Sequence, residues 1–426
     1  MPLLMLAQDN ETKKFTIDFS GFIRNDMMYN TRQVVSARAE GQFLLAPTAI
    51  NLDANDVDIN ANPNFNIIGI NSRFRAKMTG PEAFGAKTSG MIEGDFFGIS
   101  GGTKFNFRLR HAFVKLDWGT SKLLVGQYWH PSFVTGCFPG TVSFGAGVPF
   151  NPLSRVGQIR YSYNFSEKFS AFAAILGRGH FGGPSTTAAF QNAAMPEIHA
   201  QIQYQSDNFL IGAGVDYQLL KPSLTTTGLD TANQPITLVT DATIGSLSFV
   251  GFMKLTTKPL TFKLYGMYGQ NNDNLVMMGG YATVYDTTYT LEQMQEGYVE
   301  YTPYNTLSTW VDIHTNGKKT QFGIFAGYSM NMGADKDINY ATYTGRWGNV
   351  NSMMRVAPRV VFISGKSKLG FEVEYSMIDY ATQKMLADGV TADPDADLGG
   401  IDKLGKVTNF ETADNLKILL SYTFSF

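Results

Sequence analysis

The last twelve residues, NLKILLSYTFSF, place an apolar side chain at every second position up to the end. The apolar set is Leu416, Ile418, Leu420, Tyr422, Phe424 and Phe426. A repeat of two residues predicts a β-strand with two different faces. Chain ends usually fray into water, so a stripe that runs to a terminal aromatic residue indicates a strand with one face against something other than water.

The same alternation recurs along the chain in about sixteen segments, each of about the ten residues that a tilted strand needs to cross a membrane. The predicted strands are 14–24, 66–79, 87–99, 105–118, 121–130, 155–163, 169–178, 195–205, 209–219, 243–256, 260–270, 303–314, 319–331, 352–363, 368–379 and 412–426. The alternation is irregular near His111 and within 243–256. No run reaches about 18 apolar residues, so no transmembrane helix is predicted.

The connections between these segments are short and long in turn. After even-numbered segments they are tight turns of Gly, Asn, Ser and Lys, as at 164–168 and 364–368, and after odd-numbered ones they are mostly long. This predicts an all-β fold, namely a transmembrane antiparallel β-barrel with short periplasmic turns and long extracellular loops. A closed barrel has no sheet edge and satisfies every backbone amide in lipid.

Composition agrees with this fold class. Charged residues are 16% of the chain, against about 25% in ordinary soluble proteins, and aromatic residues are 13%. The net charge of −2 gives no argument for nucleic-acid binding, and the one cysteine, Cys137, excludes an intrachain disulfide. The start, MPLLMLAQ, is typical of the end of an export signal, so we expect a residual signal peptide at 1–7 and a single barrel domain at 8–426.

Two local motifs resemble known families. The ending Tyr422-x-Phe424-x-Phe426 resembles the C-terminal signal that the barrel assembly machinery reads in Gram-negative outer-membrane proteins. The segments FRLRHAFVKLDWG (107–119) and LLVGQYWHP (123–131) resemble the DcaP-like members of the sixteen-stranded trimeric porins, and the Met- and Asn-rich loops suggest a Bacteroidota source. The resemblance implies a homotrimer in the outer membrane of a Gram-negative bacterium, in contact with its lipid and lipopolysaccharide.

The resemblance also implies that the loop after the fifth strand folds inward and narrows the pore. That loop is 131–154, and its largest side chains are Phe133, Phe138, Phe144 and Phe150. It contains no charged residue, whereas many general porins place carboxylates there. The resemblance to porins therefore does not imply a transverse electric field across the pore of this chain.

If the apolar stripes face lipid, the alternate residues line a water-filled lumen. The charged residues expected there are Arg73, Arg75, Lys77, Glu93, Asp95, Arg108, Arg110 and Arg160. Six cations against two carboxylates leave this arc net positive, which favours small anions such as carboxylates or phosphates. The alternative is that carboxylates from the loops brace these arginines, which then only stiffen the wall.

Across the barrel, Arg355 and Arg359 are expected to face Glu372 and Glu374 in a structural cross-strand network. Tyr128, Tyr265 and Trp310 are further candidates for inward positions.

No motif for catalysis is found, and no two histidines have metal-ligand spacing. The sequence therefore predicts no enzyme, no metal and no cofactor. The acidic stretches 51–64 and 393–400 are interpreted as solvated outer loops rather than calcium sites.

Together these observations predict an outer-membrane porin that allows passive diffusion of small hydrophilic solutes, with a lean towards anions. The alternative function is a barrel that acts as a surface receptor or assembly partner through its long loops. Stepwise ion conductance separates the two, because a plugged scaffold passes no current.

Overall fold

The computed structural model describes residues 15–35, 46–98, 103, 105–179, 183–184, 187–286, 288–383 and 398–426. The expected signal-peptide residues 1–7 and part of the acidic stretch 393–400 lie outside the described residues.

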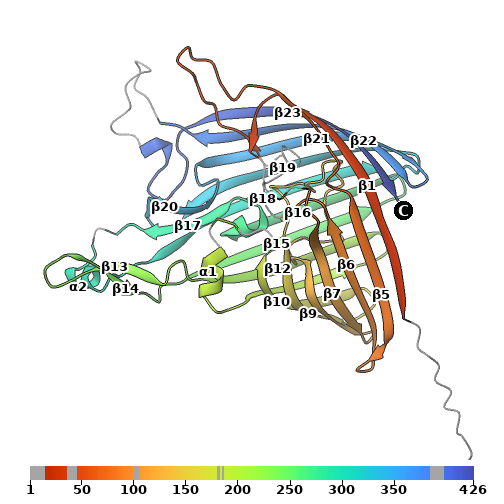
Figure 1. The fold of residues 1–426 in the computed structure, drawn as a ribbon, viewed down its shortest axis with the longest axis horizontal. Helices are drawn as coiled ribbons and strands as arrows, with labels where there is room; N and C mark the ends of the chain where they lie inside the picture. The colour runs from red at the N-terminus through yellow and green to blue at the C-terminus, as the bar shows by residue number, and fades with distance from the viewer. Residues whose placement is uncertain are drawn as a thin grey trace, which may run out of the picture.

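A closed antiparallel barrel of sixteen strands forms the body of the molecule (Figure 1). Its strands are β1 (Thr16–Asn30), β5 (Arg73–Ala83), β6 (Ala86–Asp95), β7 (Arg108–Asp117), β8 (Ser121–Trp129), β9 (Arg155–Asn164), β10 (Phe169–Gly179), β11 (Glu197–Gln205), β12 (Phe209–Leu220), β15 (Ile244–Thr256), β16 (Leu260–Gln270), β18 (Tyr301–Thr315), β19 (Thr320–Ala334), β21 (Val350–Ser364), β22 (Ser367–Ala381) and β23 (Phe410–Ser425). β4 (Asn64–Ile68) pairs with the end of β1 and continues the position of β5. β1 and β23 close the barrel, with Phe22 opposite Ser425. The predicted barrel and its strand number are confirmed.

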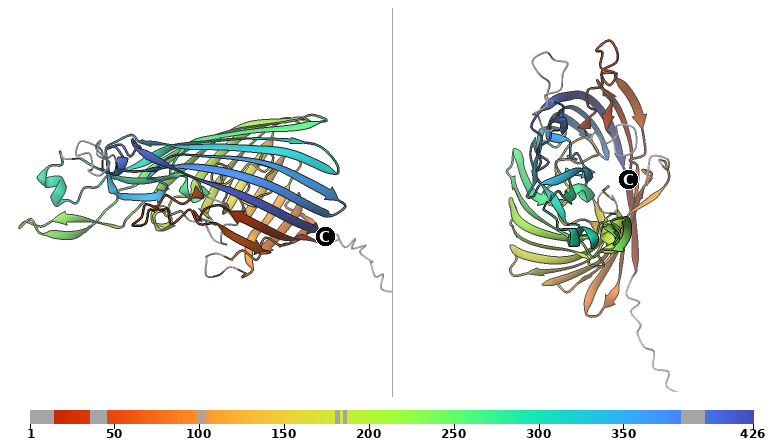
Figure 2. Two further views of the ribbon diagram at one scale, coloured as in Figure 1. Left: turned by 90° about the horizontal axis from the view of Figure 1, so that it is seen from above. Right: turned by 90° about the vertical axis from the view of Figure 1, so that its left-hand side faces the viewer.

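The remaining elements lie in the connections between barrel strands, and several of them project from the end that carries the long loops (Figure 2). They are β2 (Val34–Val35), β3 (Ala46–Pro47), α1 (Thr187–Asn192), β13 (Thr225–Leu229), β14 (Pro235–Val239), η2 (Asn272–Leu275), β17 (Gly279–Val284), α2 (Leu291–Gln295), β20 (Ile338–Arg346) and η3 (Leu398–Gly400). β17 pairs with β18 and with β20. At the other end, Gly85 and Gly365 sit in tight turns with φ of +73° and +56°, a conformation that favours glycine. No helix among the described residues is long and apolar enough to cross a membrane.

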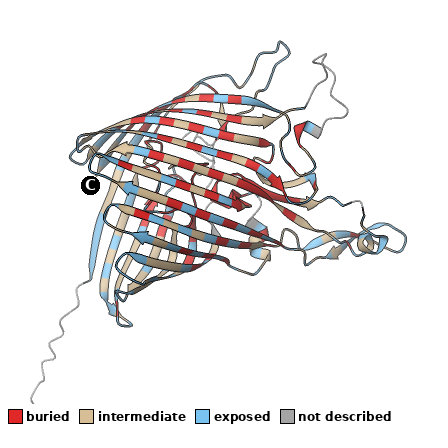
Figure 3. Cartoon of the chain, turned by 180° about the vertical axis from the view of Figure 1, so that it is seen from behind, coloured by how far each residue is buried: buried red, intermediate tan, exposed pale blue. Residues whose placement is uncertain are grey.

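Side chains alternate between the outer and inner faces of the wall, and buried and exposed positions follow one another along the strands (Figure 3). On β23, Ile418, Leu420 and Tyr422 are 38%, 38% and 48% exposed, whereas Lys417 and Ser421 are 0% and 3% exposed. The apolar stripe at the end of the chain therefore faces outward, as a lipid-facing strand requires.

A β-bulge explains the irregular alternation near His111. Glu93 lies opposite His111 and Gly94 lies opposite Leu109, so Arg110 is an extra residue in β7. Arg110 and His111 are each 3% exposed. Two consecutive side chains thus lie buried on β7, which a strict period of two does not allow.

The irregular segment 243–256 has a different cause. The inner face of β15 carries apolar residues, and Val250 and Phe252 are each 3% exposed. They belong to the same buried apolar cluster as Val134 and Phe150 of the connection between β8 and β9. The inner face of this strand is apolar because a loop packs on it.

Candidate functional site

Residues 131–154 connect β8 and β9 and lie inside the barrel. The Tyr265 hydroxyl of β16 donates a hydrogen bond to the Ser132 carbonyl at 3.0 Å. The Trp310 indole of β18 donates to Asn151 Oδ1 at 3.1 Å, and the Arg355 guanidinium of β21 donates to the Val148 carbonyl at 2.7 Å. We call this segment the inner loop, because it is bonded to side chains of strands on several sides of the lumen.

Carboxylates of the wall hold the backbone of the inner loop. The two oxygens of Glu372 accept hydrogen bonds from the Val142 and Ser143 amides, each at 2.7 Å. Asp312 accepts one from the Gly140 amide at 3.2 Å and also pairs with Arg359 at 2.8 Å. Hydrogen bonds to ionised groups are about twice as strong as neutral ones. The loop has no charge of its own, so charged side chains of the strands supply its anchors.

This arrangement changes the interpretation of the predicted cross-strand network. Arg359 pairs with Asp312 of β18, and Glu374 pairs with Lys417 of β23 at 3.2 Å. Glu372 lies opposite Arg359 in the strand register, but its two oxygens accept bonds from the inner loop. The buried charges on this side of the barrel therefore position the loop as well as the strands.

The four phenylalanines of the inner loop take two different positions. Phe150 is 1% exposed, with its ring 6.2 Å from that of Phe325 and the Arg355 guanidinium 5.4 Å from its centre. Phe133, Phe138 and Phe144 instead line a cavity beside the arginine-rich wall. Phe150 anchors the loop. Phe138, which is 41% exposed, and the half-buried Phe144 present aromatic surface to this cavity, whereas Phe133 is buried and stacks on Trp129 with centroids 4.1 Å apart.

A second segment also reaches the interior, and no pattern in the sequence predicts it. Residues 271–278 are all buried, and the Leu275 carbonyl accepts a hydrogen bond from the Leu153 amide of the inner loop at 2.8 Å. Val276 and Leu153 belong to one apolar cluster. The start of the long connection after β16 thus supports the inner loop.

The predicted arginines form a network with the two predicted carboxylates. Glu93 contacts Arg73 at 3.5 Å, Arg75 at 2.5 Å and Arg110 at 2.8 Å. Asp95 contacts Arg108 at 2.6 Å and Arg110 at 3.0 Å. Glu93 and Asp95 lie on β6, so it is the wall itself that braces these arginines.

Two further arginines join this network, and the sequence analysis missed both. Arg24 pairs with Asp26 at 2.9 Å and donates to the Val142 carbonyl of the inner loop at 2.5 Å. The guanidinium of Arg155 lies 4.8 Å from the centre of the Trp129 ring. Arg24 is the last residue of the predicted strand 14–24 and has the same parity as the buried Asp26 and Met28, so the alternation alone could have placed it inward. Arg155 is the first residue of the predicted strand 155–163.

A cavity of about 430 Å³ lies between this network and the inner loop. Its basic lining residues are Arg24, Arg73, Arg108, Arg110 and Arg155, and its aromatic ones are Tyr128, Trp129, Phe133, Phe138 and Phe144. With Arg75 added, six guanidinium groups stand against the carboxylates of Asp26, Glu93 and Asp95, a formal excess of three positive charges. The cavity combines positive charge with aromatic faces.

The other two predicted cations lie apart from this network. Arg160 borders a neighbouring cavity of about 320 Å³, where it donates to Gln158 at 2.9 Å and lies 4.6 Å from the centre of the Phe172 ring. Lys77 is exposed on β5.

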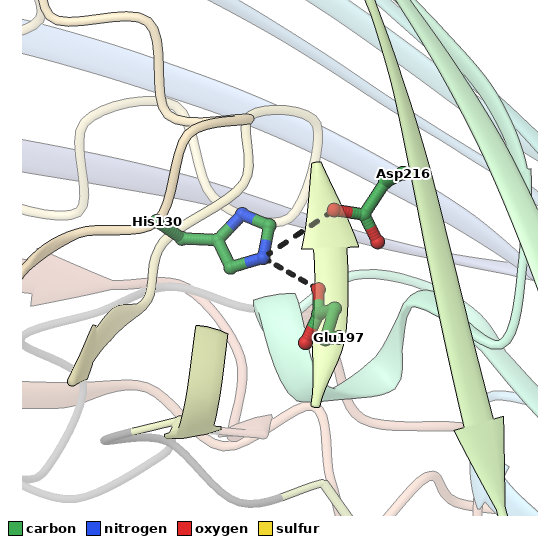
Figure 4. A group of neighbouring side chains, drawn as sticks. All are labelled: His130, Glu197 and Asp216. Carbon is green, nitrogen blue, oxygen red and sulfur yellow. Dashed lines mark hydrogen bonds and ion pairs between the residues drawn. The ribbon is translucent and has the colours of Figure 1, made fainter. Parts of the chain in front are cut away.

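A separate buried cluster joins three segments that are distant in the sequence (Figure 4). His130 Nε2 lies 2.7 Å from Glu197 Oε1 and 3.9 Å from Asp216 Oδ2. His199 Nδ1 lies 3.1 Å from Asp216 Oδ2. Spacing along the chain could not reveal this group: the pairing of β11 with β12 brings Glu197 and Asp216 close, and His130 reaches them from the connection after β8, with β9 and β10 between in the wall.

The predicted assembly signal lies at the barrel seam. The Phe426 amide donates to the Gly21 carbonyl at 3.1 Å, and the Tyr422 hydroxyl lies 3.0 Å from Ser367 Oγ. Tyr422, Phe424 and Phe426 are all exposed on the outer face.

Comparisons with known proteins give matches in three-dimensional structure, whereas no family model and no curated protein matches the sequence. The outer membrane channel DcaP of Acinetobacter baumannii is similar with a TM-score of 0.66 and 15% identity, over 97% of each chain. OmpT of Vibrio cholerae is similar with a TM-score of 0.53 and 12% identity, over 97% of this chain and 98% of that one. A trimer form of OmpT gives 0.51 and 12%, over 96% and 99%. The fold is therefore that of outer-membrane channel barrels.

Proposed function

We propose that this protein is a porin of the outer membrane of a Gram-negative bacterium. Small hydrophilic solutes diffuse through it passively, anions in preference to cations, without a chemical step. The observation that carries the proposal is the positively charged, aromatic-lined cavity between the inner loop and the arginine network, inside a barrel whose outer face is apolar. The similarity to a protein described as an outer membrane channel supports the same function.

Two features of the interior account for the selection of solutes by size and charge. The inner loop narrows the passage, so larger solutes diffuse more slowly. The excess of guanidinium groups over carboxylates raises the local concentration of anions, because low-dielectric walls focus the field. Among the arginines that line the cavity, Arg24 and Arg73 have the clearest part in this, since their side chains are 13% and 14% exposed whereas those of Arg108 and Arg110 are 3% exposed.

The proposed function also implies partners for this chain. A homotrimer agrees with the trimer form of the similar OmpT. The apolar outer face suits outer-membrane lipid and lipopolysaccharide, and the exposed aromatic side chains at the seam suit recognition by the barrel assembly machinery.

Ion selectivity in planar lipid bilayers tests the proposal. We expect Arg24→Gln with Arg73→Gln to lower the ratio of anion to cation permeability. A unit charge at about 7 Å in water contributes about 0.6 kcal/mol, so losing two weakens anion enrichment by up to about sevenfold before screening by salt. The partner carboxylates keep other contacts, because Asn71 donates to Asp26 and both Arg75 and Arg110 contact Glu93.

The matched control removes two positive charges from a turn. Lys318→Gln with Lys319→Gln lies between β18 and β19 and makes the same change in net charge. Its reversal potential under a KCl gradient is expected to stay close to that of the wild type. An unchanged reversal potential in the arginine variant would refute the selectivity role.

A further inference from the structure

We propose that His130, Glu197 and Asp216 bind one divalent transition-metal ion, with Zn²⁺ as the ion that fits best. One donor atom from each residue lies within 4.8 Å of the others. Zinc takes imidazole nitrogen and carboxylate oxygen ligands at about 2.0–2.2 Å, and three protein ligands are a common set. Small side-chain movements would bring all three donors to such distances from a central ion.

The charge balance of the cluster favours a cation. The side chains of His130, Glu197 and Asp216 are 0%, 3% and 10% exposed. In the part of the chain that the structure describes, no lysine or arginine lies within ion-pair distance of either carboxylate, and their ion-pair contacts are to His130 and His199. The Glu197 side chain also hydrogen-bonds to Asp216 and Gln218. Buried carboxylates are normally paired with cations or coordinate metals. A divalent ion would neutralise both.

The surroundings orient the ligands. His199 Nδ1 lies 3.1 Å from Asp216 Oδ2 and can donate to it, and the His199 ring stacks on Phe172 with centroids 5.7 Å apart. A ligand held by a second hydrogen-bonding side chain is typical of metal sites. His199 is thus a positioning residue for Asp216.

Binding also requires one rearrangement. The Ser132 amide donates to His130 Nδ1 at 3.2 Å, so the ring proton of His130 resides on Nε2, towards Glu197. When a metal occupies Nε2, this proton moves to Nδ1 and the bond from Ser132 is lost. The site is therefore weaker than one in which the ligand is already in the binding tautomer.

The position of the cluster indicates what the ion would do. His130 directly precedes the inner loop, and Glu197 and Asp216 belong to β11 and β12. A bound ion would tie the base of the inner loop to the barrel wall. This role does not depend on the ion selectivity proposed above.

Metal content and calorimetry test the proposal on the full-length, detergent-purified protein with Zn²⁺ as the probe. We expect one zinc per chain after dialysis against zinc and then against metal-free buffer. Asp216→Asn and Glu197→Gln should each weaken zinc binding at least tenfold. Co²⁺ bound to the wild type should give the absorption band of a low-symmetry site, and both variants should lack this band.

The control is His314→Gln, which removes a histidine that lies 2.9 Å from Asp312, outside the cluster. It should bind zinc as the wild type does. Heat-modifiable migration on gels shows whether the barrel of each variant is folded. If one variant does not fold, the zinc affinity of the other variant tests the proposal. Substoichiometric zinc in the wild type, or equal affinity in the folded variant and the wild type, would overturn the proposal and leave a hydrogen-bonded cluster.

Discussion

The hydrogen bonds that Glu372 accepts from the inner loop lead to a quantitative prediction. In Glu372→Gln the side-chain amide keeps one oxygen that can accept a hydrogen bond. Its NH₂ group replaces the second oxygen, which accepted from a backbone N–H at 2.7 Å, so one of the two hydrogen bonds is lost. A hydrogen bond to a charged group contributes about 1.5–3 kcal/mol. Since 1.4 kcal/mol is about tenfold in an equilibrium constant, the population of the released loop should rise about 10- to 150-fold.

The single cysteine of the chain provides the assay. Cys137 belongs to the inner loop and is 0% exposed, with Sγ 3.3 Å from the Met253 carbonyl. Burial raises the pKa of its thiol to about 11. A maleimide can therefore modify this thiol only when the loop opens, and the rate of modification should follow the population of the released loop.

We expect Glu372→Gln to accelerate modification of Cys137 by the factor given above, and Glu167→Gln, an exposed turn residue, to leave the rate unchanged. Rates that are equal in Glu372→Gln and the wild type would refute the assignment of Glu372 as an anchor. Fast modification of the wild type would show that the loop is not packed as described.

Three more predictions concern packing, closure and screening. Phe150→Ala should destabilise the folded protein by about 3–5 kcal/mol, because its ring is fully buried, and a lower temperature of heat denaturation on gels would show this. Gly21→Val should reduce the yield of folded barrel, because a Cβ there would lie 2.2 Å from the Arg73 carbonyl and 2.6 Å from the Phe426 ring. The control Gly251→Val should fold normally, because the space around that glycine is open. The anion preference should fall as KCl rises from about 0.1 to 1 M, since the screening length shrinks from about 10 to 3 Å; a preference that is independent of salt would contradict an electrostatic origin.

The barrel could be predicted from the sequence because its signal is local. A strand with lipid on one side and water on the other shows a period of two in its own residues, as the C-terminal residues Ile418 and Leu420 illustrate. The period failed at Arg110, where a bulge inserts one residue, and on β15, where Val250 and Phe252 meet the inner loop. Both failures come from contacts that a single strand does not encode.

The candidate site was predictable only in part for the same reason. The sequence placed Glu93 and the neighbouring arginines on adjacent strands, and the structure brings them together. It could not show that Glu372 accepts bonds from the inner loop, about 230 positions away in the chain. The grouping of His130 with Asp216 likewise depends on the path of the connection after β8, because β8 and β12 are not paired in the barrel wall.

On the proposed function, water and ions pass through this barrel beside the inner loop. Single-channel recording of the purified wild-type protein in a planar lipid bilayer tests it most directly. We predict discrete, stable conductance steps whose reversal potential under a KCl gradient has the sign of an anion-preferring pore. Inserted protein that gives no conductance steps would contradict the claim and favour a receptor or an assembly partner.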